Sequence, residues 1–164
     1  MLFRSALTLP ISSAAICASF GLVGLAGGAA VAGCCAQMVG FAVMSYKENK
    51  LDGLVSQGLG TSMLQMGNIC RNPRIWIPPT LAAAITGPLS TTLFKLECNG
   101  VSAGMGTCGL VGPIGVISAT EQSTMMWIGL VLLCLVLPAI LSLIFGEILR
   151  KIGWIKENDL LLGK

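Results

Sequence analysis

The sequence has no histidine and few charged residues. Only 10% of its 164 residues are Asp, Glu, Lys or Arg, whereas a soluble domain has about 25%. With 54% hydrophobic residues and a mean hydropathy of +0.85, the chain has too little charge to cover a water-facing surface. The composition therefore argues against an ordinary soluble domain and predicts an integral membrane protein lying in the lipid bilayer.

The sequence also lacks the patterns of metal and nucleic-acid sites. None of its seven cysteines forms a CxxC pair, and without histidine a mixed Cys/His zinc site cannot be built. Most of the cysteines lie in apolar runs, so we interpret them as small buried hydrophobic residues. The basic residues stand at segment ends, so the net charge of +3 does not indicate nucleic-acid binding. We expect no metal, no cofactor and no nucleic-acid partner.

Long uncharged runs predict an all-α membrane fold with about four transmembrane helices. Residues 6–46 contain no charge and are about twice as long as one span, so we divide them at the pair Gly27-Gly28. The stretch from Ile75 to Leu96 and the stretch from Met125 to Leu149 are each long enough to cross a bilayer. The predicted spans are 6–26, 28–46, 75–96 and 125–149.

Glycine-rich stretches separate these spans. Residues 53–70 and 101–119 are apolar but dense in glycine, which disfavours a plain helix, and too poor in charge for solvated loops. We predict two re-entrant or broken segments there. The second contains GMGTCGLVGPIG, but it lacks the Gly-Lys-Ser/Thr ending of a phosphate-binding loop.

The span 75–96 organises the chain. It follows the turn Asn72-Pro73-Arg74, and Pro88 after Gly87 interrupts its pattern. Proline removes a backbone donor, and lipid offers no water to replace it, so a break must be buried in protein or line a wet cavity. The pattern predicts a broken span of the kind with which transporters build a binding site.

The distribution of Lys and Arg predicts the orientation. Basic residues flank the stretch from Lys47 to Arg74 and follow the last span from Arg150 onwards, whereas residues 97–124 contain none. Because basic loops stay on the cytoplasmic side, both chain ends should lie in the cytoplasm. Labelling of Cys98 from outside is expected to test this.

Several motifs together resemble a known family. They are LTLPISSAAI (7–16), CCAQMVGFAVMSYKEN (34–49), QGLGTSMLQMGNI (57–69), NPRIWIPPTLAAAITGPLSTTLFKL (72–96) and GMGTCGLVGPIG (104–115). The chain resembles the C-terminal half of enzyme IIC, the sugar-specific membrane subunit of the bacterial phosphotransferase system (PTS), and is distantly similar to the fructose type. The resemblance implies a single partial membrane domain over residues 1–164.

The resemblance also implies a division of labour. The membrane subunit is a permease that binds a sugar and moves it across the plasma membrane, while a IIB partner phosphorylates the sugar with phosphate taken from IIA. The subunit is not itself the phosphoryl-transfer enzyme, and the lack of histidine fits a subunit that carries no phosphate. Such subunits are usually homodimers.

The resemblance directs attention to polar residues before the proline turn. Fructose-type subunits have a sugar-binding glutamate there, but residues 61–70 contain no acid. The candidates that replace it are Gln65 and Asn68, which are three residues apart and can share a helical face, together with Ser62. Gln37 is a further candidate because it is an amide inside an uncharged span.

The missing glutamate leaves a second interpretation open. The chain could be a membrane regulatory or scaffold protein that is derived from the enzyme IIC fold and has lost transport. An unrelated channel is a weaker hypothesis because the sequence has no charge ring and no filter motif. Binding of sugars separates the transport and regulatory interpretations.

Overall fold

The computed structural model describes residues 13–156 and 158–162, and within these ranges the regular structure is helical. The first part of the predicted span 6–26 lies outside the described residues. The α-helices are α2 (Ser13–Ser19), α3 (Leu25–Met44), α4 (Tyr46–Val55), α5 (Met66–Arg71), α6 (Ile77–Thr92), α7 (Gly100–Ala103), α8 (Val111–Ala119), α9 (Thr124–Val131) and α10 (Leu137–Lys151). Short 3-10 turns cover Ser62–Gln65, Pro73–Trp76 and Cys108–Leu110, and π-helical turns cover Ser56–Gly60 and Leu132–Val136.

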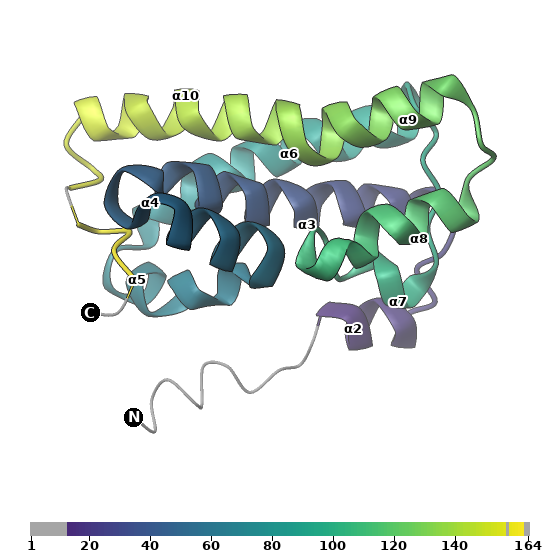
Figure 1. Cartoon of the computed structure of the whole chain (residues 1–164), viewed down its shortest axis with the longest axis horizontal. Helices are drawn as coiled ribbons and strands as arrows, with labels where there is room; N and C mark the ends of the chain where they lie inside the picture. The colour runs from purple at the N-terminus through teal and green to yellow at the C-terminus, as the bar shows by residue number, and fades with distance from the viewer. Residues whose placement is uncertain (1–12, 157, 163–164) are drawn as a thin grey trace.

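Three long helices form the body of the molecule (Figure 1). α3 lies in the middle, with α6 and α10 packed on it. Gly40 of α3 faces Ser142 of α10 and Pro79 near the start of α6, whereas Gly28 near the start of α3 faces Leu96, just beyond the end of α6. α6 therefore runs antiparallel to α3. α10 runs parallel to it, and the ends of α3 and α10 meet at the same end of the bundle.

Among the described residues, α3 and the continuous helix from Thr124 to Lys151 are long and apolar enough to cross a membrane, at 20 and 28 residues. The long apolar helices confirm the predicted all-α membrane fold. α6 has 16 residues and is preceded by the turn Pro73–Trp76, and α2 has only 7 residues. Two helices, not the predicted four, therefore meet the length criterion for a span in this part of the chain.

The expected division at Gly27-Gly28 is wrong. Both glycines lie inside α3 and are buried, and the chain turns earlier, between Gly21 and Gly24, which have φ of 60° and 64°. The reason is a close backbone approach: a Cβ on Gly28 would lie 1.8 Å from the carbonyl oxygen of Leu96. The glycine pair packs a helix against a neighbouring backbone instead of ending it.

The expected break at Pro88 is also wrong, because α6 continues through the proline to Thr92. The hydroxyls of Thr91 and Thr92 donate to the carbonyl of Pro88 at 3.0 and 2.8 Å, and Ser90 donates to Gly87 at 2.7 Å. These hydroxyls bond back along their own helix. They do not replace the bond lost at Pro88, because the missing N–H would have bonded to the carbonyl of Ala84.

The glycine-rich segments fold into short helical pieces. Residues 101–119 contain α7, a 3-10 turn and α8, with left-handed backbone at Gly106 and Gly109. Residues 53–70 contain the end of α4, the π-helical turn, the 3-10 turn Ser62–Gln65 and most of α5. Whether either segment enters the membrane stays a prediction.

All seven cysteines are free thiols. Cys17, Cys35, Cys98 and Cys134 are buried, as a packing role requires, but Cys70 is exposed. Cys98 has no exposed surface, and desolvation raises the pKa of its thiol, so less of it is reactive thiolate. Its position is therefore unsuitable for labelling from outside.

The close contact at Gly28 predicts a stability effect. Gly28→Ala places a methyl group on the Leu96 carbonyl and should destabilise the protein by roughly 1–3 kcal/mol, as overpacking does. Gly33→Ala in the same helix is the matched control, because nothing lies within 4 Å of its added Cβ. Thermal unfolding in detergent should show a lower Tm for Gly28→Ala only. Equal Tm values would show that the helix and turn separate easily.

The topology predicts which positions are accessible from outside. In a Cys70→Ser background, a cysteine at the exposed position Gln122 should react with an impermeant maleimide on intact cells. A cysteine at the exposed position Lys50 should react only after permeabilisation, because the stretch around it is basic. The Cys70→Ser parent measures background labelling. Labelling of Lys50→Cys but not of Gln122→Cys on intact cells would reverse the orientation.

Candidate functional site

A polar cluster lies at the end of the bundle where α3 and α10 finish. It contains a carboxylate and amides from α4 and from the Ser62–Gln65 turn with α5, and these groups meet around the backbone of Leu160. Glu48 Oε2 accepts from the Leu160 N–H at 2.7 Å. Asn49 and Gln65 each donate an amide hydrogen to the Leu160 carbonyl, both at 2.8 Å. We call Glu48, Asn49, Gln65 and Asn68 the carboxylate–amide cluster.

The amides of this cluster are also joined to each other and to the next residues of the tail, by which we mean residues 154–156 and 158–162 after α10. Asn68 donates to Gln65 Oε1 at 2.7 Å and to the Leu161 carbonyl at 3.0 Å. Asn49 Oδ1 accepts from the Leu162 N–H at 2.8 Å. Gln65 is fully buried and Asn68 is 9% exposed. The structure thus brings together the predicted pair Gln65 and Asn68, as their spacing indicated.

Local backbone features place these side chains. Thr61 is extended, and its hydroxyl caps the 3-10 turn by accepting from the Met63 N–H at 3.2 Å. That turn runs directly into α5, so Gln65 and Asn68 follow each other along one helical face. On the other side, Lys50 has a left-handed φ of 50°, which breaks the helix immediately after Glu48 and Asn49. Strained backbone of this kind is often found at functional sites.

An ion pair fixes the carboxylate. Arg150 of α10 donates to Glu48 Oε1 at 3.1 Å and to the Met44 carbonyl at the end of α3 at 3.0 Å. The Glu48 side chain is 7% exposed and that of Arg150 is 19% exposed. The guanidinium therefore holds one carboxylate oxygen, while the other faces the Leu160 backbone.

An apolar layer lies next to this cluster. The side chains of Leu160 and Ile155 are buried in one hydrophobic group with Phe41, Ile75 and Leu149. Members of this group come from α3, α10, the Pro73–Trp76 turn and the tail. The segment after α10 is therefore held by hydrogen bonds to its backbone and by burial of the Leu160 side chain.

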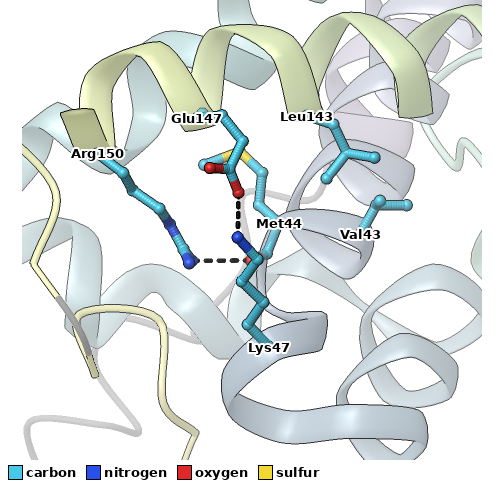
Figure 2. Close-up of a pocket in the computed structure, with 7 residues that line it drawn as sticks. Val43, Met44, Lys47, Leu143, Glu147 and Arg150 are labelled. Atoms are coloured by element: carbon cyan, nitrogen blue, oxygen red, sulfur yellow. Dashed lines mark hydrogen bonds and ion pairs between the residues drawn. The ribbon is translucent and has the colours of Figure 1, made fainter.

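A shallow pocket opens beside the cluster (Figure 2). Val43, Met44, Lys47, Leu143, Gly146, Glu147 and Arg150 line it. Lys47 and Glu147 form an exposed ion pair across it. Its volume of about 20 Å³ is enough for one water molecule but not for a sugar ring.

The other predicted site residues lie in different surroundings. Ser62 is half-buried at the first position of the 3-10 turn that ends at Gln65. Gln37 of α3 accepts from the Trp76 indole N–H at 3.2 Å and donates to the Thr80 hydroxyl at 3.1 Å. Gln37 thus uses both ends of its amide between α3 and α6. In the described structure it joins these helices to each other.

Sequence reasoning missed part of the polar network. Glu48 and Asn49 are not among the candidates that the sequence indicates, because their contacts with residues more than 100 positions away have no local sequence signal. Gln57 is fully buried, donates to the Ser45 hydroxyl at 2.7 Å, and its Oε1 has no hydrogen-bond partner among the described residues. It could have been found, because it is an amide in an uncharged run, the same signal that pointed to Gln37.

The fold and this cluster define a helical membrane protein with a buried polar cluster at one end of its helix bundle. The family described as "Phosphotransferase system, EIIC" matches residues 1–162. The chain therefore belongs to the EIIC family, the membrane component of phosphotransferase-system sugar transport in the plasma membrane, and the predicted resemblance is confirmed. No curated protein and no solved structure matches it, and the distant fructose-type relationship stays a prediction.

The two ion pairs to α10 should differ in their contribution to stability. Arg150→Met leaves Glu48 largely buried without its cation and should cost about 3 kcal/mol of unfolding free energy. Lys47→Met breaks a pair whose side chains are 61% and 44% exposed and should cost less than about 1 kcal/mol. Denaturant unfolding in detergent compares the two variants. A larger loss in Lys47→Met would contradict the assigned role of Arg150.

Proposed function

We propose that the chain binds a sugar and translocates it, coupled to phosphorylation by a IIB partner that takes its phosphate from IIA. The observation that favours this function is the buried carboxylate–amide cluster in a member of the EIIC family. Sugars are recognised by a few convergent donors and acceptors in an otherwise dry site. Glu48 supplies an acceptor, while Gln65 and Asn68 can each donate and accept.

The contacts with Leu160 support this chemistry. The cluster holds one N–H donor through Glu48 and one carbonyl acceptor through Gln65. A sugar hydroxyl also offers a donor and an acceptor, so the same groups can hold hydroxyls in place of a peptide. Glu48 further provides the acid that residues 61–70 lack.

The position of the cluster suits phosphorylation by a soluble partner. It lies at the basic end of the bundle, with Lys47, Lys50, Arg71 and Arg74 nearby in the chain, and this end is predicted to be cytoplasmic. A sugar held there would present a hydroxyl to IIB. In this proposal the chain binds and orients the sugar, IIB supplies the phosphoryl group, and a homodimer is the expected working unit.

A transport-inactive regulatory or scaffold protein is the second candidate. It is favoured by the occupation of Gln65, Asn68 and Glu48 by the protein's own tail and by the small volume of the adjacent pocket. Neighbouring reading frames for IIB or IIA would favour transport. Binding of a panel of radiolabelled sugars, followed by phosphorylation of the bound sugar by IIB, decides between the two functions. A sugar that binds and is phosphorylated supports transport. If no sugar in the panel does so, the result supports the regulatory or scaffold function.

The proposed sugar contacts predict a loss of affinity. Gln65→Ala and Asn68→Ala each leave a desolvated hydroxyl unpaired, which costs about 1–3 kcal/mol, or roughly tenfold to hundredfold in Kd. Equilibrium binding to equal amounts of folded protein measures the change. Cys108→Ala is the control and should leave affinity unchanged. Normal binding by both amide variants, alone and in a Leu160→Ala background that weakens the competing segment, would place the sugar elsewhere.

A further inference from the structure

The segment after α10 is bound in the manner of a peptide ligand. Side chains of the carboxylate–amide cluster form hydrogen bonds with the backbone of three consecutive residues. The groups they contact are the Leu160 N–H and carbonyl, the Leu161 carbonyl and the Leu162 N–H. The Leu160 side chain has no exposed surface. Backbone bonds combined with one buried anchor are typical of peptide recognition.

Contacts outside the cluster fasten the start of the tail. Asn72 donates to the Trp154 carbonyl at 3.0 Å and to Asp159 Oδ2 at 2.8 Å. The guanidinium of Arg74 lies 4.9 Å from the centre of the Trp154 ring. Asp159 also accepts from the Lys156 N–H at 2.9 Å, which closes a turn. The bonds to the Trp154 carbonyl and from the Lys156 N–H are exposed, and the bond between Asn72 and Asp159 is part-buried. This outer layer of contacts can therefore be loosened before the buried side chains of Ile155 and Leu160 are released.

The tail uses the groups that a sugar would need. Gln65 Nε2, Asn68 Nδ2 and Glu48 Oε2 all bond to its backbone. The tail and a sugar therefore cannot both hold these atoms in the same geometry. The pocket next to the cluster has a volume of only about 20 Å³ and is itself too small for a sugar ring.

We propose that the tail is a displaceable plug that closes the sugar site, with the Leu160 backbone occupying the position of sugar hydroxyls between Glu48 and Gln65. This regulation rests on the proposed sugar-binding function of the cluster. In the plugged state the site is closed, and release of the tail opens it toward the basic end. Only the fraction of molecules with a released tail binds sugar, so the apparent affinity is reduced by that fraction.

Loosening the anchor should tighten sugar binding. Leu160→Ala removes most of the buried side chain without altering the cluster and should lower the apparent Kd about tenfold or more, because the open fraction rises. Ile152→Ala is the matched control, since Ile152 is 59% exposed just before the tail. Asp159→Ala, which loses only the bonds near the surface, is a second and milder releasing variant. It keeps the test valid if Leu160→Ala does not fold.

Fixing the tail should have the opposite effect. In a Cys70→Ser background, Asn72→Cys with Asp159→Cys can be joined by a short bis-maleimide, because the two side chains are in contact. The cross-linked protein should lose sugar binding at least about tenfold relative to the same protein before cross-linking. The single variant Asn72→Cys, treated with the same reagent, controls for modification of the surface.

Hydrogen exchange supplies a readout of the tail that needs no sugar. The amides of Leu160 and Leu162 should exchange slowly in the unmodified chain and faster in Leu160→Ala and Asp159→Ala. A saturating sugar should also speed their exchange, because it displaces the tail. Gln65→Ala should lower sugar affinity more in the Leu160→Ala background than alone, since Gln65 holds both the sugar and its competitor.

The outcomes separate the plug from the proposed function. Tighter binding on release and weaker binding on cross-linking support the plug. If the unmodified chain binds sugar and neither change alters Kd although exchange shows a released tail, the plug is wrong and the sugar-binding function stands. If no sugar binds to the unmodified or the released protein, sugar binding fails and the plug fails with it.

Discussion

The structure depends on the close backbone contact between the start of α3 and the turn that follows α6. Gly27 and Gly28 lie against the carbonyls of Cys98 and Leu96, where any side chain would collide. Lipid provides no hydrophobic force between helices, so close packing of small residues must hold them together. This contact fixes α6 antiparallel to α3 and makes α3 the buried middle helix on which α10 also packs.

The arrangement of the long helices determines where the polar groups can be buried. Because α3 and α10 run parallel, their last turns lie side by side, and Arg150 can reach the Met44 carbonyl and Glu48 together. The same arrangement brings the tail, which follows α10, onto α4 and α5. The carboxylate–amide cluster is thus a consequence of helix direction, even though its members are widely separated in the sequence.

Part of the fold could be predicted because apolar length and hydropathy act locally. The uncharged runs indicated α3 and the continuous helix that ends at Lys151. Gly27-Gly28 and Pro88 were wrongly predicted to break helices. A residue that disfavours an isolated helix can still lie inside one when contacts with a neighbouring segment outweigh that preference. In α3 the neighbouring segment is the backbone at Leu96, whose carbonyl lies too close for any side chain at Gly28.

The site was less predictable than the fold for the same physical reason. The three-residue spacing of Gln65 and Asn68 is a local signal, and the structure places them together. Glu48 joins them through the backbone of Leu160, a contact between residues 112 positions apart. No local pattern encodes such a contact, because it depends on the direction of α10 and on the length of chain beyond it.

The burial of these polar groups limits the states the site can have. A buried amide without a partner costs about 1–3 kcal/mol, and a buried carboxylate costs more. Leaving Glu48, Gln65 and Asn68 all buried without partners would therefore cost several times the free energy of one unpaired amide. The three groups must be bonded to the tail, to water or to a ligand. Exchange between bound partners is then the natural way for such a site to open, since each incoming hydroxyl replaces a bond that the departing backbone gives up.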